Sequence, residues 1–299
     1  MKDLVLYCKS YRRDFLRLKR LLASIERYNI DDIPFYISTP TSDKDLLEEV
    51  LGLDGYFWVA DEEIILANPL AELNRFREMP GGLSQQIIKA EFWRLGLTDN
   101  YLCIDSDSKF IRDFRYSDLM TDDKVPYTVL HQNKELFQMA CNRGYKKVER
   151  DLSLEADRVK ALFNRSGPNF YCAPSPFNWS AKVWQSLDDM YLQPQGIAIW
   201  DLITPAHPES LIYGEAAIKY RAIPLIAIEP LFRVYHYDWQ YYLMRRLGET
   251  EEKLKKQYLG VIFQSSWSLS DQLDGPRKSL ASQFLRRIKR LGRYLQSYI

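Results

Sequence analysis

The residues that most clearly suggest a chemical function in this chain are Asp105 and Asp107. They are separated by one residue and directly follow the apolar segment 101–104. A short apolar run predicts a buried strand, and strands of an open α/β sheet point their carboxyl ends toward the ligand crevice. Two carboxylates this close repel each other unless a cation lies between them. Mn²⁺ or Mg²⁺ binds carboxylate oxygens together with substrate phosphates and stabilises the charge on a departing diphosphate. The pair therefore predicts a divalent-cation site for a phosphorylated substrate.

Two other interpretations of this segment stay open. Acidic loops are common, so the pair also fits a solvated turn in which Asp105 and Ser106 bond to the local backbone. The pair is also similar to that of haloacid-dehalogenase-like phosphohydrolases, in which Asp105 would be the nucleophile. Those enzymes usually carry Thr or Val two residues after the second aspartate, where this chain has Lys109. They also usually place the pair on the first strand, which counts against this alternative.

The elements that must position these carboxylates alternate between strands and helices. Strands are expected at 3–8, 35–38, 56–60, 101–104, 127–130 and 231–237, and helices at 15–28, 43–51, 84–97, 154–163, 178–191 and 208–220. Such alternation indicates βαβ units and a mostly parallel sheet. The predicted fold class is α/β, a Rossmann-type sheet flanked by helices. One domain over 1–275 and a C-terminal helical extension over 276–299 account for the chain.

The charge of the chain is close to balanced but unevenly distributed. Lysine and arginine number 41 and aspartate and glutamate 40, whereas the segment 276–299 carries seven basic residues and no acidic one. The rest of the chain therefore has a net charge of 34 − 40 = −6, and this negative charge disfavours a general nucleic-acid binder. The four scattered cysteines suggest neither disulfides nor a zinc site. Without a recognisable signal peptide, the expected location is the cytoplasm.

The basic C-terminal segment is predicted to form an amphipathic helix. Apolar residues recur at three- and four-residue steps from Leu280 to Leu295, with arginine and lysine on the other faces. Such helices lie on anionic membranes, where each basic side chain contributes about 1 kcal/mol. Residues 280–299 are therefore expected either to hold the protein at the inner face of the plasma membrane or to pack on the domain.

Four segments resemble a known family. They are 10–29 followed by the strand PFYIST, then 81–95 (GGLSQQIIKAEFWRL), 100–114 (NYLCIDSDSKFIRDF) and, more weakly, PESLIYG at 208–214. These segments resemble GT-A-type nucleotide-sugar glycosyltransferases, and within them a bacterial group of unassigned function with a QQxxK helix and a DxD motif. The chain departs from the group at Leu83, where an aromatic residue is usual, and at Ser108 and Lys109, where an apolar residue often follows.

The resemblance implies a GT-A-like fold and a set of donor-binding residues. In GT-A enzymes the loop after the first strand holds the nucleotide, and the helix with Gln85, Gln86 and Lys89 faces the donor. A surface tyrosine or an exposed helix lysine would look the same in the sequence. The implied donor-binding residues are Lys9, Ser10, Tyr11, Asp61, Gln86, Lys89, Asp105 and Ser106, and the implied metal ligands are Asp105, Asp107 and His236.

The resemblance also implies acceptor and proton-transfer residues. An inverting transferase needs a general base; Glu209 fits, with Glu215 as the second choice, although a first-turn glutamate also stabilises a helix dipole. The aromatic stretch 169–180 suits a sugar acceptor through Tyr171, Asn178 and Trp179, with core packing as the alternative. A half-buried, structurally bonded histidine is the alternative for His236.

The function implied by the resemblance is sugar transfer, leaning to inversion of configuration, from a nucleotide-sugar, by default a UDP-sugar, to a glycan or lipid-linked acceptor. Surface polysaccharide synthesis is the expected setting, with Mn²⁺ or Mg²⁺ as cofactor. A phosphohydrolase using Asp105 and a non-catalytic module that binds glycans or membranes are the alternatives.

Overall fold

The computed structural model describes residues 3–171, 176–264 and 288. The amphipathic helix expected over 276–299, and with it the membrane contact expected over 280–299, lies outside the described residues apart from Ile288. All statements below concern the described part of the chain.

A five-stranded sheet forms the centre of the molecule, in the spatial order β3-β2-β1-β4-β7. β1, β2, β3 and β4 are parallel, and β7 is antiparallel to β4. The α/β fold class and the mostly parallel sheet are therefore confirmed. The strands are β1 (Val5–Lys9), β2 (Phe35–Thr39), β3 (Phe57–Ala60), β4 (Asn100–Cys103) and β7 (Phe177–Ser180).

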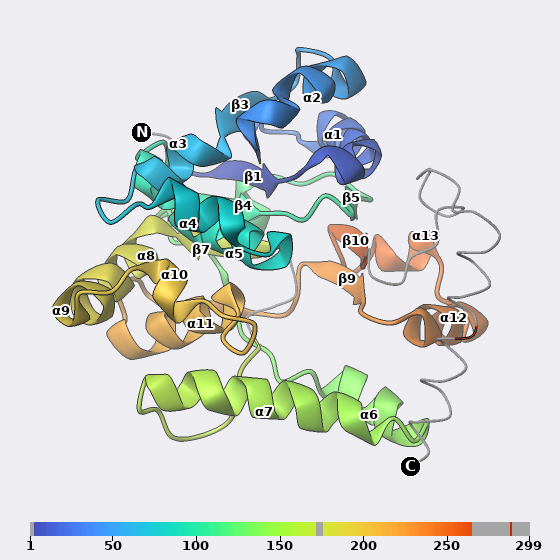
Figure 1. Cartoon of the computed structure of the whole chain (residues 1–299). Coiled ribbons are helices and arrows are strands. Elements are labelled where there is room, and N and C mark those ends of the chain that lie inside the picture. The colour runs from blue at the N-terminus through green and yellow to red at the C-terminus, as the bar shows by residue number, and fades with distance from the viewer. Residues whose placement is uncertain (1–2, 172–175, 265–287, 289–299) are drawn as a thin grey trace.

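Both faces of this sheet are buried, as the unbroken apolar runs of its strands require. Side chains of β1 alternate between the two halves of the core, with Val5 and Tyr7 on one face and Leu6 and Cys8 on the other. Figure 1 shows α1 and α2 above the sheet, with α5, α8, α10 and α11 below it. These helices are α1 (Phe15–Tyr28), α2 (Lys44–Leu51), α5 (Gly81–Glu91), α8 (Ala181–Leu187), α10 (Ile199–Leu202) and α11 (Glu209–Tyr220).

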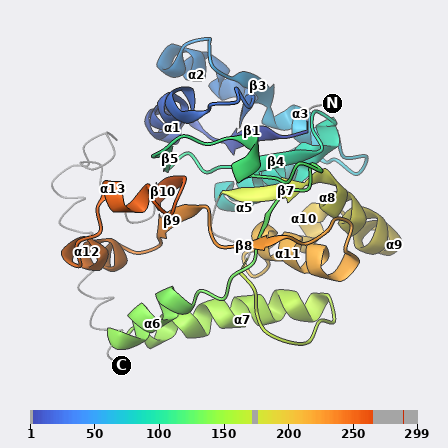
Figure 2. The ribbon, with the colours of Figure 1, turned by 180° about the vertical axis from the view of Figure 1, so that it is seen from behind.

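The first half of the chain also contains the short helices α3 and α4, and the second half adds a further layer of helices, α6 and α7. The views from the front and from behind both place α6 and α7 as the lowest layer of the molecule (Figures 1 and 2). The remaining helices are α3 (Asp61–Leu66), α4 (Leu73–Glu78), α6 (Lys134–Asn142), α7 (Lys146–Leu162), α9 (Gln193–Gln195), α12 (Asp238–Arg246) and α13 (Glu251–Leu254).

A three-stranded sheet, β5-β10-β9, lies beside the main one, and β6 pairs with β8. Gly260 begins the central strand β10, opposite Phe110 of β5 and Phe232 of β9. A Cβ atom built at Gly260 would lie 2.3 Å from the Phe232 ring and 2.6 Å from the Lys109 carbonyl oxygen. The three strands can therefore close together only around a glycine. They are β5 (Ser108–Phe110), β9 (Phe232–Tyr235) and β10 (Gly260–Phe263), and the pair is β6 (Thr128–Val129) and β8 (Ala227–Ile228).

Two sequence predictions about local structure are wrong. The helix expected over 178–191 begins only at Ala181, because Asn178 and Trp179 belong to β7 and pair with β4. The helix expected over 84–97 begins already at Gly81, directly after Pro80, and the Ser84 hydroxyl donates to the Gly81 carbonyl at 3.2 Å. In both cases tertiary pairing or a preceding proline decides the boundary, which helical spacing alone does not reveal.

Candidate active site

The candidate site lies where the order of the sheet reverses. The chain runs outward from β1 through β2 to β3 and then returns to the other side of β1 with β4. Such a switch point leaves a crevice at the carboxyl ends of the two adjacent parallel strands. Lys9, Ser10 and Tyr11 continue from the end of β1, and Asp105, Ser106 and Asp107 follow the end of β4. The two segments singled out in the sequence therefore meet at one edge of the sheet.

A cleft of about 300 Å³ opens at this edge and gathers most of the predicted donor-binding residues. Asp105, Ser106 and Asp107 line it, together with Gln85, Gln86 and Lys89 from α5 and with Glu209 from α11. The sequence did not predict that Phe177 of β7 and Ile262 of β10 line the cleft, because these strands reach it only through the strand pairings of the folded chain. The full lining is Lys9, Tyr11, Asp14, Gln85, Gln86, Lys89, Asp105, Ser106, Asp107, Phe177, Glu209, Ser210, Ile262 and Gln264.

Lys89 is a buried cation that lines this cleft. Its Nζ lies 2.5 Å from Asp105 Oδ1 and 3.8 Å from Glu209 Oε1, and it stands 5.6 Å from the centre of the Phe177 ring. The side chain is only 5% exposed. Burial alone lowers the pKa of a lysine, but here the two carboxylates outweigh it and raise the pKa of Lys89, which stays charged. The alternative of an exposed helix lysine is therefore wrong.

Glu209 enters the cleft as the first residue of α11. Its carboxylate is buried, and burial raises its pKa against the opposing attraction of Lys89. Its backbone amide donates to Gln86 Oε1 at 3.3 Å, which ties the start of α11 to α5. Glu215, the alternative base, is not brought to the cleft. Arg165 makes a bidentate ion pair with its carboxylate, with N–O distances of 2.5 and 2.7 Å.

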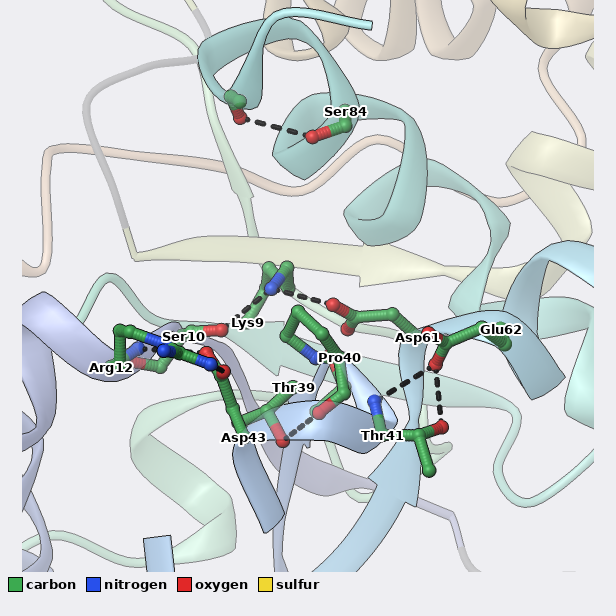
Figure 3. Close-up of polar contacts among 12 residues, drawn as sticks. Lys9, Ser10, Arg12, Thr39, Pro40, Thr41, Asp43, Asp61, Glu62 and Ser84 are labelled. Carbon is green, nitrogen blue, oxygen red and sulfur yellow. Dashed lines mark hydrogen bonds and ion pairs between the residues drawn. The ribbon is translucent and has the colours of Figure 1, made fainter. Parts of the chain in front are cut away.

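Asp61 lies behind the cleft rather than along it. Lys9 reaches from β1 to Asp61 at the start of α3, with 2.7 Å between Nζ and Oδ2, and also donates to the Ser10 carbonyl at 2.6 Å (Figure 3). Both side chains are buried, and burial raises the pKa of Asp61 to about 6 against the attraction of Lys9. This pair fixes the loop after β1, so Asp61 acts on the cleft through Lys9.

The predicted acceptor residues are not exposed in a cleft. Trp179 is 1% exposed and packs between Phe177 and Trp184 in the core. The Asn178 amide is buried and donates to the carbonyl oxygens of Leu119 and Tyr127. Tyr171 is also buried. The core-packing alternative therefore describes Asn178 and Trp179, whose side chains hold β7 in place.

His236 lies in a second cleft, of about 440 Å³, together with His131 and Arg233. Burial, with the nearby His131 and Arg233, lowers the pKa of His236 to about 4. His236 follows β9, whereas Asp107 precedes β5, and β10 lies between these strands. Two strand spacings put the backbones of the two residues about 10 Å apart. His236 lines the second cleft and not the first, and its role as a metal ligand stays a prediction.

The first cleft has the chemistry of a divalent-cation site completed by substrate. Counting its described lining residues, two lysines and four carboxylates (Asp14, Asp105, Asp107 and Glu209) give a net charge of −2, which one divalent ion offsets. The described residues contain no group of three or more His, Cys, Asp or Glu side chains arranged to hold a metal. An ion such as Mg²⁺ characteristically uses one or two carboxylates and takes its other ligands from water and phosphate. Asp105 and Asp107 fit that pattern.

Comparison with known sequences gives a family without an assigned activity. A family model described as "Family of unknown function (DUF6492)" matches residues 3–247. No curated protein matches the sequence. Within the described residues, none of the helices combines the length and apolar composition that crossing a bilayer requires.

Comparison with solved structures identifies the fold. The galactosyltransferase LgtC, solved with donor and acceptor sugar analogues, is similar over 87% of each chain at 11% identity, with a TM-score of 0.50. Mouse xyloside xylosyltransferase 1 in its apo form covers 89% of this chain and 99% of its own at 7% identity, with a TM-score of 0.46. The arrangement of sheet and helices is thus that of the GT-A fold, as the sequence resemblance implied. At these identities the likeness concerns fold alone.

Proposed function

Because this chain belongs to a family of unknown function, DUF6492, we propose its activity from its own site: it is a glycosyltransferase that uses a nucleotide-sugar donor and a divalent cation. The observation that carries the proposal is the meeting of Asp105, Asp107, Lys89 and Glu209 in one cleft at the switch point of a GT-A-like sheet. A nucleoside diphosphate fits such a cleft, because a cationic side chain and a metal ion held by carboxylates together offset its negative charge.

The donor diphosphate would occupy the charged part of the cleft. Mn²⁺ or Mg²⁺, when bound by Asp105 and Asp107, supplies Lewis-acid stabilisation of the departing diphosphate. Lys89 adds a fixed positive charge from the floor of the cleft, which is effective because it is buried and held by Asp105. Tyr11 lines the cleft after β1 and is proposed to contact the nucleoside, whereas Ser10 is buried, does not line the cleft and stays a prediction. UDP is the expected nucleotide.

Glu209 is proposed as the general base. In an inverting transfer the acceptor hydroxyl oxygen forms a bond to the anomeric carbon, the bond to the diphosphate oxygen breaks, and the hydroxyl proton leaves to a base. Glu209 lines the cleft, and burial raises its pKa, which favours proton uptake. Gln86 holds its backbone at 3.3 Å, so the carboxylate is kept in position from α5.

Thermal stability in the presence of nucleotides tests the proposal. UDP, GDP and CMP are each added to the full chain with Mn²⁺, with Mg²⁺ and with EDTA. We expect UDP with Mn²⁺ to raise the melting temperature, and EDTA to reduce this shift, because binding to the folded state alone stabilises it. A protein that no nucleotide stabilises with any metal would contradict the proposal.

Two variants separate the proposed role of Asp107 in metal binding from the proposed role of Glu209 in proton transfer. Asp107→Asn should abolish the metal-dependent part of the nucleotide shift, whereas Glu209→Gln should keep the shift and lose sugar transfer. Transfer is followed as UDP release from UDP-glucose, UDP-galactose and UDP-N-acetylglucosamine in the presence of bacterial polysaccharide fractions. The setting of surface polysaccharide synthesis is part of the proposal, and release with none of these fractions would speak against it.

A further inference from the structure

The second cleft has no role in the proposed donor chemistry and is larger than the first. At about 440 Å³ it falls within the roughly 300–1,000 Å³ typical of ligand pockets. It lies between the start of α6, the loop before β9 and the strand β9 itself. Its lining comprises Leu130, His131, Gln132, Asn133, Lys134, Glu135, Leu136, Phe170, Glu229, Pro230, Phe232, Arg233, Val234, His236, Gln240 and Tyr258.

The charges of this cleft are compensated within the protein. Its lining contains two cations, Lys134 and Arg233, and two carboxylates, Glu135 and Glu229, so they sum to zero. Arg233 is 5% exposed, and its guanidinium donates to both oxygens of Glu135, at 2.6 and 3.2 Å. Glu249 faces the same guanidinium at 3.1 Å. An arginine engaged in this way has little capacity to bind a phosphate or a carboxylate ligand.

The cleft also presents a set of uncharged polar groups beside aromatic rings. Imidazole and amide groups of His131, Gln132 and Gln240 line the cleft, and the half-buried rings of Phe170 and Tyr258 form parts of its wall. Gln240 is held in place, since its Oε1 accepts from the His236 amide at 2.9 Å. Fixed amides beside aromatic surfaces match a molecule with hydroxyl groups and apolar faces.

The two clefts are neighbours across a single pair of strands. Ile262 of β10 lines the first cleft and Val234 of β9 lines the second, and these two residues are register partners. Adjacent strands lie about 4.8 Å apart. A chain of linked sugars in the second cleft would therefore end close to the charged cleft.

We propose that the second cleft binds an uncharged glycan segment, which forms part of the acceptor for the reaction proposed above. The binding itself follows from the cleft alone, whereas its role as acceptor rests on the proposed function. The proposal favours neutral sugars over uronic acids and over phosphates, because Arg233, the buried cation of this cleft, is already held by Glu135 and Glu249.

Saturation-transfer NMR on the full chain tests the proposal without nucleotide. The probes are maltotriose, cellotriose and N-acetylchitotriose, with trigalacturonate and pyrophosphate as anionic comparisons. We expect at least one uncharged trisaccharide to bind and to bind better than trigalacturonate. Binding by the anionic probes alone, or by no uncharged trisaccharide, would overturn the proposal.

Variants place the binding in this cleft. Gln132→Ala removes an amide from the wall and should weaken trisaccharide binding by roughly threefold to tenfold, the range of one or two hydrogen bonds. Phe170→Ala removes an aromatic surface and should also weaken it. Gln138→Ala is the control, because Gln138 lies on helix α6, which follows Gln132, and it is exposed and donates to Asn142 outside the cleft. Equal binding by Gln132→Ala, Phe170→Ala and the unchanged protein would show that the sugar binds elsewhere.

Addition of UDP and Mn²⁺ separates this inference from the proposed function. Two clefts predict that the trisaccharide and UDP bind at the same time, and that Gln132→Ala leaves the UDP-dependent thermal shift unchanged. Trisaccharide binding without any nucleotide shift would contradict the proposed function and the acceptor role but leave the glycan site. Displacement of the trisaccharide by UDP would overturn the second site.

Discussion

The two clefts of this molecule differ in how their charges are balanced. The first has an excess of carboxylates, because Lys89 faces Asp105 and Glu209 while Asp107 lies beside them. The second contains the equally buried Arg233, but Glu135 and Glu249 both pair with it. A charge that the protein compensates serves stability, whereas a surplus that the protein leaves in a cleft serves a ligand. The difference predicts that mutation of a carboxylate in the first cleft lowers activity more than stability, and that mutation of Arg233 in the second cleft lowers stability more than nucleotide binding.

Asp107→Ala should produce the largest functional loss. Removal of one of two metal-binding carboxylates is expected to lower the rate of sugar transfer by at least about 10³-fold, because a metal ion contributes several kcal/mol to stabilising the transition state. The free energy of unfolding should stay the same or rise, since one of several like charges is lost. Initial rates and urea titrations measure the two effects. Asp113→Ala, which removes an exposed carboxylate nearby, is the control and should change neither.

Glu209→Gln should lower the transfer rate by roughly 10²-fold, as expected for loss of a general base. Donor binding should persist, because the amide keeps the shape of the side chain and the link from Gln86 to the backbone. Glu215→Gln is a close comparison on the same helix, paired with Arg165 and outside the cleft. It should cost stability and leave the rate per folded molecule unchanged. Equal rate losses in the two variants would remove the case for Glu209.

Arg233→Met tests the opposite expectation for the second cleft. Loss of the guanidinium leaves the Glu249 carboxylate, whose side chain is 12% exposed, without Arg233, and breaking a buried pair of this kind costs about 3 kcal/mol. The side chain of Glu135 is 58% exposed, so loss of its pair should add little. Urea denaturation should show this loss, while the UDP-dependent thermal shift of the folded protein stays unchanged. Arg246→Met, an exposed arginine on α12, should have little effect on stability. Stability unaffected by Arg233→Met would break the contrast between the clefts.

Glu91→Gln should have the smallest effect and change mainly the pH dependence of stability. Glu91, the last residue of helix α5, shares Arg94 with Asp188, and burial raises the pKa of Glu91 to about 7 against the attraction of Arg94. The unfolded chain releases this proton near its ordinary pKa of 4.5. Stability should therefore fall as pH rises from 4.5 to 7, by about 1–3 kcal/mol. The variant should show a flatter profile in urea titrations between these pH values, and a profile as steep as that of the unchanged protein would refute the assignment.

The sequence predicted the first half of the molecule more accurately than the second. The helix expected over 15–28 matches α1, and the strands expected at 35–38 and 101–104 fall within a residue or so of β2 and β4. Regular periodicity and short connections carry that information locally. The donor-side residues could be placed for the same reason, since a strand end fixes which residues reach the crevice.

The second half depends on pairings between distant segments, which periodicity does not encode. Asn178 and Trp179 have helical spacing with their neighbours, but pairing with β4 makes them a strand and buries them. His236 was expected inside a strand over 231–237, but β9 ends at Tyr235 and His236 lines the second cleft. The second cleft itself was not predicted, because α6, β9 and the loop at Phe170 come together only in three dimensions.

Gly260 sets a limit on how this region can vary. Any larger residue there would force Phe232 or the backbone of Lys109 aside and open the ribbon of β5, β10 and β9. Ile262 of β10 lines the first cleft and Val234 of β9 lines the second, so a wider ribbon would move a sugar chain in the second cleft away from the carboxylates that are proposed to bind metal. The absence of a side chain at position 260 thus keeps the two clefts one strand spacing apart, and this is the distance that the proposed acceptor would have to bridge to reach the proposed donor.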